Sequence, residues 1–134
     1  MKTTEIQRIN AELGTSYTNL DEETWDDISA NQKLTEKFIE KHKNRVHWGI
    51  ISEYQQLSEG LIEKYTNKVY WPWISKSQHL SEKFIEKYAE RVNWYWISLS
   101  QPLSEAFIAK HAEQVNWGCI SVSQKLRKKK KKKY

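Results

Sequence analysis

Apolar residues recur along this chain with a fixed period. Tryptophan stands at five positions spaced 23 residues apart: Trp25, Trp48, Trp71, Trp94 and Trp117. Isoleucine and serine follow three and four residues after each tryptophan, and glutamine and leucine follow seven and nine residues after it. A period of this length, kept without a gap, indicates a protein built from tandem structural repeats.

The first half of each repeat predicts an amphipathic helix. In LSEKFIEKYAERV, residues 80–92, the apolar positions form one helical stripe and the charged positions lie outside it. Ser81 suits the N-cap, and Glu82 suits the first turn, where a negative charge interacts well with the helix dipole. Leu80 and Ile85 have the spacing of a hydrophobic staple. We expect a helix of about three turns here.

The second half of the repeat, NWYWISLSQP at residues 93–102, allows two interpretations. Its aromatic residues suit a β-strand. However, the recurring positions Trp94, Ile97 and Gln101 are spaced three and four residues apart, which follows one face of a helix. We therefore favour a second short helix. In the first copy, TWDDIS, we expect Thr24 to be the N-cap.

Two short antiparallel helices per repeat, stacked on like neighbours, predict an all-α fold of the α-solenoid type. A single repeat could not bury both its tryptophan and its phenylalanine stripe, so stacking must create the core. Residues 20–126 hold the repeats, with four full periods over residues 25–116 and partial repeats beside them.

Residues 1–19 lack the repeat and predict an N-terminal cap segment. Ile6, Ile9 and Leu13 share one helical face, and Gly14 suits the position just after a helix. Such a helix would cover the first repeat, as the end of a repeat stack usually requires.

A polybasic tail occupies residues 127–134. On the same period, LRKKKKKKY aligns with LSEKFIEKY at residues 80–88, so lysine replaces the apolar pair at Lys130 and Lys131. Like charges four residues apart oppose a helix, so we predict a disordered tail. It would attract phosphate polymers and resembles a nuclear-import signal; the alternative is a solubilising terminus. Its basic residues are Arg127, Lys128, Lys129, Lys130, Lys131, Lys132 and Lys133.

Charge and cysteine content narrow the picture further. The tail holds seven of the 22 basic residues, so the rest of the chain, with 15 basic against 17 acidic residues, is slightly acidic. The single cysteine, Cys119, excludes an internal disulfide and a cysteine-cluster metal site. No apolar run reaches membrane-spanning length and no secretory signal is evident. We expect an intracellular protein, cytoplasmic, or nuclear if the tail is an import signal, with no membrane partner.

No catalytic or cofactor-binding pattern stands out. His42 and His111 occupy a helical position that tyrosine holds in other repeats, and neither an H-E-x-x-H motif nor a glycine-rich phosphate loop occurs. The serine and glutamine of every repeat suit structural roles: we expect Ser98 to bond a backbone carbonyl and Gln101 to satisfy groups at a helix end. We therefore expect no enzyme activity, no cofactor, no metal site and no small-molecule substrate.

Positions that vary between repeats are the better candidates for function. The two residues after each tryptophan read Asp26-Asp27, Gly49-Ile50, Pro72-Trp73, Tyr95-Trp96 and Gly118-Cys119. A slot that accepts aspartate and tryptophan alike should lie on the surface, with Trp73, Trp96, Tyr95 and Tyr70 close together. Clustered exposed aromatics are typical of binding hot spots. The alternative is that the indoles cover the groove between repeats as peripheral core.

A protein is the favoured partner for these aromatics. Stacking of single-stranded bases on them is conceivable, but the body lacks the basic groove that such binding requires. Nucleic-acid binding through the lysine tail is the alternative function.

The recurring VNWYWIS..Q.LSE.FI.K is similar to a short tandem repeat in proteins of bacteriophages and large DNA viruses. The resemblance covers Leu20 to Leu126 and leaves out the lysine tail. It implies a viral accessory protein that acts on a host or defence component, and it carries over no catalytic residue.

Overall fold

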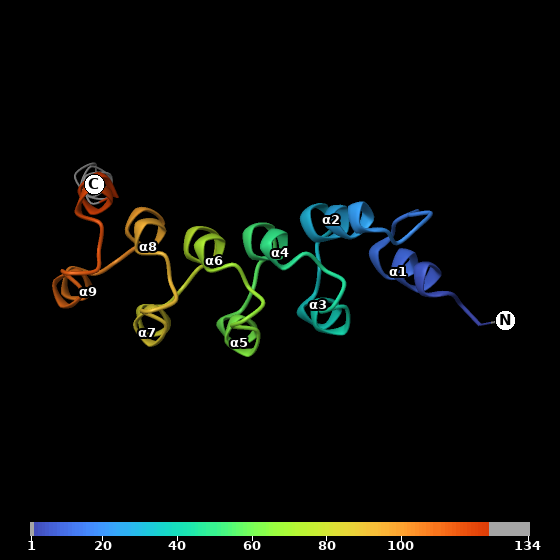
Figure 1. The fold of residues 1–134 in the computed structure, drawn as a ribbon, viewed down its shortest axis with the longest axis horizontal. Helices are drawn as coiled ribbons and strands as arrows, with labels where there is room; N and C mark the ends of the chain where they lie inside the picture. Colours follow the sequence, from blue (N-terminus) through green and yellow to red (C-terminus); the bar gives the residue numbers. More distant parts are fainter. Residues whose placement is uncertain (1, 124–134) are drawn as a thin grey trace, which may run out of the picture. The chain divides into compact units, whose positions relative to one another are not determined.

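The structure, a computed structural model, describes residues 2–123, which contain helices joined by turns and no strand (Figure 1). The chain divides into two compact units, Met1–Val69 and Tyr70–Tyr134. The N-terminal unit holds α1 (Glu5–Leu13), α2 (Glu22–Asn31), α3 (Glu36–Lys41), α4 (Trp48–Tyr54) and α5 (Glu59–Lys64). The C-terminal unit holds α6 (Trp71–Ser77), α7 (Glu82–Lys87), α8 (Trp94–Ser100) and α9 (Glu105–Lys110), followed by helical residues 117–123.

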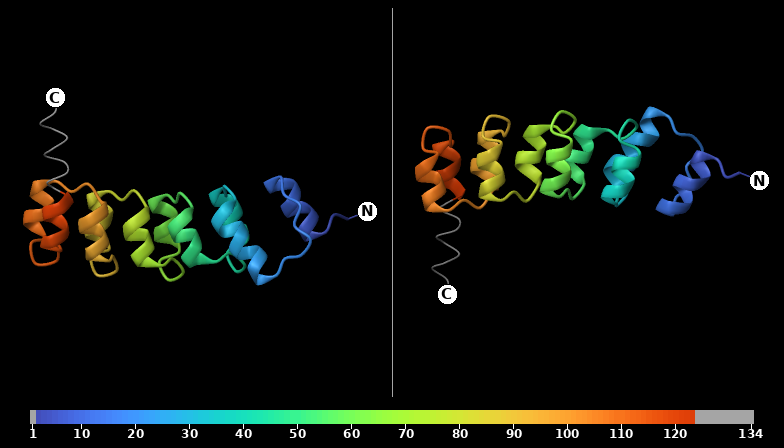
Figure 2. Two further views of the ribbon diagram at one scale, coloured as in Figure 1. Left: turned by 90° about the horizontal axis from the view of Figure 1, so that it is seen from above. Right: turned by 90° about the horizontal axis from the view of Figure 1, so that it is seen from below.

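Within each unit the repeats form two rows of helices. In the N-terminal unit α2 packs against α4 in one row, and α3 and α5 lie in the other (Figure 1). In the C-terminal unit α6 packs against α8, and α7 and α9 form the second row. Figure 2 shows from two further sides that the helices of a row run side by side. The prediction of two helices per repeat, rather than a helix and a strand, is confirmed.

Side-chain caps start most of these helices where the sequence predicts. In the first helix of each repeat, the Oγ of the cap residue accepts the N–H of the residue three positions on; the caps are Thr35, Ser58, Ser81 and Ser104. In the second helices His47 Nδ1 accepts the N–H of Ile50, and Asn93 Oδ1 accepts that of Trp96. A cap of this kind satisfies one of the amides that a helix leaves unpaired at its start.

Two boundary predictions are wrong. The helix expected over residues 80–92 ends at Lys87, because Tyr88 leaves the helical region (φ −108°, ψ 30°). The chain continues as a tight turn in which Tyr88 O accepts from the amides of Arg91 and Val92 at 2.8 and 3.0 Å. In the first copy the N-cap is Asp21 and not Thr24, whose N–H donates to Asp21 Oδ1 at 2.9 Å. Acidic residues before Thr24 favour an earlier start of the helix.

The core follows the predicted stripe, with one exception among the tryptophans. The isoleucines of both helices are fully buried at Ile28, Ile39, Ile51, Ile62, Ile74, Ile85 and Ile97. Trp25 and Trp71 are buried, whereas Trp48 and Trp94 are half-buried. Trp117, which follows the four full periods, is 56% exposed and does not belong to the core.

Aromatic residues of the following helix cover some of these indoles. Trp71 stacks on Phe84 with ring centroids 6.2 Å apart, and Trp94 stacks on Phe107 at the same distance. These phenylalanines stand 13 residues after their tryptophans, and the corresponding position after Trp117 is Lys130. The sequence therefore has no aromatic residue at this position after Trp117, whereas Trp25, Trp71 and Trp94 each have a phenylalanine there.

Buried glutamines join neighbouring repeats, and the carbonyls that Gln101 satisfies lie at the end of a helix, as expected for it. Gln55 Nε2 donates to Ser29 O and Gln32 O at 2.8 and 2.7 Å, and its Oε1 accepts the N–H of Leu34 at 3.1 Å. Gln101 makes the equivalent bonds in the C-terminal unit, to Ser75 O, Gln78 O and Leu80 N. Because the two carbonyls belong to the preceding repeat and the leucine amide to the repeat of the glutamine itself, each glutamine fixes the register of one repeat on the next.

The recurring serines have a related structural role. Ser29 and Ser75 each donate to the carbonyl of the tryptophan four residues earlier, at 2.7 and 2.8 Å. Each also accepts a backbone N–H from the next repeat, from His47 and Asn93 respectively. Ser98 accepts the N–H of Asn116 at 2.9 Å, so its bond across the repeats is to an amide.

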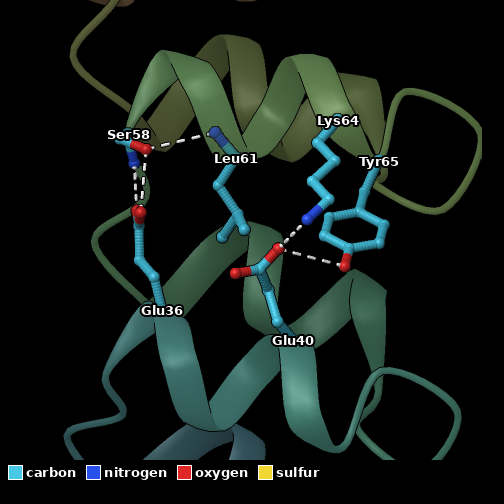
Figure 3. A network of polar contacts seen from close by, with 6 residues as sticks. All are labelled: Glu36, Glu40, Ser58, Leu61, Lys64 and Tyr65. Carbon is cyan, nitrogen blue, oxygen red and sulfur yellow. Dashed lines mark hydrogen bonds and ion pairs between the residues drawn. The ribbon is translucent and has the colours of Figure 1, made fainter.

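Charged and polar side chains pair between α3 and α5 in the N-terminal unit, and between α7 and α9 in the C-terminal unit. Figure 3 shows Glu36 of α3 accepting both the N–H and the O–H of Ser58, at 2.7 and 2.9 Å. Glu40 accepts from Lys64 at 2.5 Å and from Tyr65 at 3.3 Å, and the bond from Lys64 lowers the pKa of Glu40. The C-terminal unit repeats the pattern in the pairs Glu82–Ser104 and Glu86–Lys110.

The N-terminal helix α1 forms as the sequence predicts and packs within its unit. Thr4 caps it in a capping box with Gln7, and Gly14 ends it with a left-handed φ of 68°. Ile9 is buried, and Glu5 pairs with Arg45 at 3.3 Å. The side chains of α1 face the end of α3, where His42 lies.

His42 should make stability depend on pH. It is buried against Phe38 and Trp25, with ring centroids 4.5 and 5.4 Å away, and burial lowers its pKa below 6.5. The charges that act on it are Lys41 and Arg45, which also lower the pKa, and Glu5 and Glu12, which raise it. The unfolded chain therefore binds the proton more readily, and stability is lost as pH falls from about 6.5 toward the folded pKa.

The measurement is urea unfolding between about pH 7.5 and 5.5 for wild type, His42→Tyr and His79→Tyr. Tyrosine occupies the position of His42 in other repeats and cannot gain a proton in this range. In His42→Tyr the free energy of unfolding should therefore decrease less as the pH falls. His79 is exposed, and its variant is the matched control that should keep the loss. If the free energy of unfolding changes with pH equally in all three proteins, His42 is not the cause of the pH dependence.

Candidate binding surface

Four of the aromatic residues that vary between repeats lie together in the C-terminal unit. Tyr70 is the N-cap of α6, Trp73 lies in its first turn, and Tyr95 and Trp96 lie in the first turn of α8. Because α6 and α8 pack in one row, equivalent positions on the two helices become neighbours. We call these four residues, together with Lys76, the aromatic ridge.

Ring contacts and one cation hold the aromatic ridge together. The rings of Tyr70 and Trp73 have centroids 6.1 Å apart, and Tyr95 meets Trp96 edge to face at 5.1 Å. The Lys76 ammonium lies 4.9 Å from the centroid of Trp73 and 5.0 Å from that of Trp96. Cations are attracted to the faces of indoles at such distances, so Lys76 bridges the two repeats.

The local sequence places both indoles in the same slot. Pro72 in the first turn of α6 is tolerated there, since that amide has no partner within the helix. In α8 the Asn93 side chain accepts the N–H of Trp96 and fixes the start of the helix at Trp94. Trp73 and Trp96 therefore each take the third position of their helix, one step before a fully buried isoleucine.

The two tyrosines are more open to solvent than the two indoles. Tyr70 and Tyr95 are each 50% exposed, whereas Trp73 and Trp96 are half-buried. The structure thus brings the four predicted residues into one surface. The alternative interpretation, that the indoles cover the groove between repeats, also agrees with part of this geometry. Both indoles are half-buried, and Lys76 contacts one indole from each of the two neighbouring repeats.

Lys76 is the ridge residue that sequence reasoning missed. It is exposed, and it is the one charged residue in α6 and α8, which contain no acidic residue. No carboxylate among residues 2–123 forms an ion pair with it. A signal was present in the sequence: Lys76 stands three residues after Trp73, a spacing that places two side chains on one helix face.

The same slot in the N-terminal unit carries different side chains. In α4 it holds Gly49 and Ile50, and in α2 it holds Asp26 and Asp27. Asp27 accepts from Tyr17 at 2.5 Å, and this bond lowers the pKa of the Asp27 carboxyl. Within the part of the chain that the structure describes, the aromatic ridge is therefore confined to the C-terminal unit.

The other candidate, the basic tail from Arg127 to Lys133, lies outside the described residues. Over residues 2–123, no cluster of three histidine, cysteine, aspartate or glutamate side chains is arranged to hold a metal ion. In the same range no helix has the length and apolar character to span a bilayer.

No protein-family model, curated protein or solved structure matches the chain. Any function must therefore be inferred from the chemistry of the aromatic ridge and from the sequence.

Proposed function

We propose that this protein is a non-enzymatic binding module, an α-solenoid that presents the aromatic ridge to a protein partner. The observation that carries the proposal is the pair Trp73 and Trp96, held at the surface by one lysine and flanked by two half-exposed tyrosines. Tryptophan and tyrosine offer large, rigid contact areas with a polar tip, and they dominate binding energy at protein interfaces.

A protein partner suits the ridge better than a nucleic acid. Sites for single-stranded nucleic acid combine stacking rings with a basic groove that follows the phosphates. The aromatic ridge has a single cation, Lys76, and the chain outside its tail is slightly acidic. Nucleic-acid binding would therefore have to come from the tail rather than from the ridge.

The solenoid itself is supported by the repeat. The 23-residue period runs from Trp25 to Trp117 in the sequence without a gap, and both units join their repeats through the same glutamine bonds. In this proposal α1 is the N-terminal cap, and the basic tail lies outside the described residues. The resemblance to viral tandem repeats adds an accessory role inside the host cell, against a host or defence component.

Affinity capture from a lysate of the cells in which the protein occurs tests this proposal. The baits are the wild-type chain, Trp73→Ala with Trp96→Ala, and a full-length variant in which Arg127 to Lys133 are replaced by glutamine. Tyr54→Ala removes an exposed aromatic outside the ridge and is the matched control. A partner should bind wild type, the tail variant and the control, and the double substitution should weaken binding at least about 100-fold if each indole contributes 1.4 kcal/mol or more.

The alternative function has its own pattern of results. Proteins or nucleic acids that remain bound to the double variant, disappear with the tail variant and are released by moderate salt would be held by the lysines. That outcome would contradict the ridge proposal and support a nucleic-acid-associated protein.

A further inference from the structure

We propose that the segment bound by the aromatic ridge is an acidic stretch of protein, and that Lys76 pairs with one of its carboxylates. This inference rests on the proposed binding function and specifies the chemistry of the partner. It starts from Lys76 because that residue is the charge at the centre of the ridge.

Lys76 differs from the lysines and arginines that form ion pairs within their own unit. Each of three others has a carboxylate partner within its own unit: Arg45 pairs with Glu5, Lys64 with Glu40 and Lys110 with Glu86. The Lys76 ammonium has two indoles instead and no carboxylate among residues 2–123. Indole faces attract the cation but do not neutralise it, so its charge remains available to an incoming anion.

The surroundings of Lys76 would strengthen such a pair. The flanking indoles are half-buried, and their ring centroids lie 4.9 and 5.0 Å from the ammonium. An ion pair beside apolar rings experiences less screening than one in open solvent. Because α6 and α8 contain no acidic residue, no side chain of these two helices repels an approaching carboxylate.

The number of charges favours a peptide over a nucleic acid. A single lysine can neutralise one carboxylate, whereas a nucleic-acid strand brings a phosphate with every nucleotide. The tyrosines at the two ends of the ridge, Tyr70 and Tyr95, are half-exposed and have hydroxyl groups. They suit the backbone polar groups and apolar side chains of an extended acidic segment.

Selection of random displayed peptides on the full-length protein tests this inference. Four proteins are compared: wild type, Lys76→Glu, Lys83→Glu, and Trp73→Ala with Trp96→Ala. Lys83 is an exposed lysine of α7, so its variant changes the net charge equally but lies off the ridge. All four keep the basic tail, and peptides that the double tryptophan variant also selects are discarded as tail-bound.

The remaining, ridge-dependent peptides should be enriched in aspartate and glutamate for wild type and for Lys83→Glu. Lys76→Glu should instead select lysine or arginine at the corresponding position. It should also weaken binding of a wild-type-selected peptide by at least about tenfold, which corresponds to 1.4 kcal/mol. Binding of that peptide to wild type should decrease as salt is raised.

The outcomes separate this inference from the function on which it rests. Ridge-dependent peptides without acidic enrichment, or peptides that bind Lys76→Glu as well as wild type, would overturn the acidic segment and leave the ridge as a binding surface. If no peptide depends on Trp73 and Trp96, both proposals fail. A fluorescent single-stranded oligothymidylate that binds wild type but neither ridge variant would overturn the choice of a protein partner.

Discussion

Replacing Trp71 with alanine should lower the free energy of unfolding by about 3–5 kcal/mol, the usual cost of removing a buried tryptophan. The Trp71 side chain is 8% exposed and packs against Phe84 and Tyr88, with ring centroids 6.2 and 5.4 Å away. The Arg91 guanidinium lies 5.5 Å from its ring and covers it further. The cavity left by alanine would lie between α6 and α7, and neither helix can move in to fill it.

Trp117→Ala is the matched control, because this indole has the same place in the repeat but is 56% exposed. We expect it to cost about 1 kcal/mol or less. Urea unfolding followed by circular dichroism measures both variants. Equal losses at Trp71 and Trp117 would show that coverage by the following helix does not decide how much a periodic indole stabilises the fold.

Gln101→Ala should lower the free energy of unfolding by about 3 kcal/mol, although the residue is polar. Its side chain satisfies three backbone groups, Ser75 O, Gln78 O and the N–H of Leu80, at 3.0, 2.7 and 3.3 Å. Each buried polar group left without a partner costs about 1–3 kcal/mol, and entry of water would recover part of the total.

Gln56→Ala is the control for the glutamine substitution, since Gln56 is exposed and stands next to the buried Gln55. Its effect on unfolding in urea should stay within about 0.5 kcal/mol. A loss below about 1 kcal/mol for Gln101→Ala would mean that the glutamine bonds do not hold neighbouring repeats together.

Much of the fold could be predicted because one residue pattern is repeated. Five copies at a constant spacing separate the positions that packing requires, such as Ile74 and Gln101, from those that are free to vary. Tryptophan, isoleucine and glutamine follow one another at spacings of three and four residues, which distinguishes a helix from a strand. The same comparison identified Trp73 and Trp96 as residues outside the shared core, which is why they could be expected to meet on neighbouring repeats.

Three features were not predicted, because each depends on contacts that the sequence of a single repeat does not contain. The end of α7 depends on the turn around Tyr88, and helix ends are poorly determined by local preference. Trp117 is exposed although it keeps its place in the 23-residue period, so the period alone does not determine how deeply an indole is buried. The position of Lys76 between two indoles depends on the distance between α6 and α8, which periodicity does not contain.

The indole N–H signals of the protein offer the most direct test of whether the aromatic ridge carries binding. The chain has seven tryptophans, so a ¹⁵N-labelled sample should give seven assignable indole signals. On addition of a ridge-dependent acidic peptide, the signals of Trp73 and Trp96 should shift, whereas those of the buried Trp25 and Trp71 should stay in place. Shifts confined to other tryptophans, with Trp73 and Trp96 unchanged, would contradict the proposed binding surface.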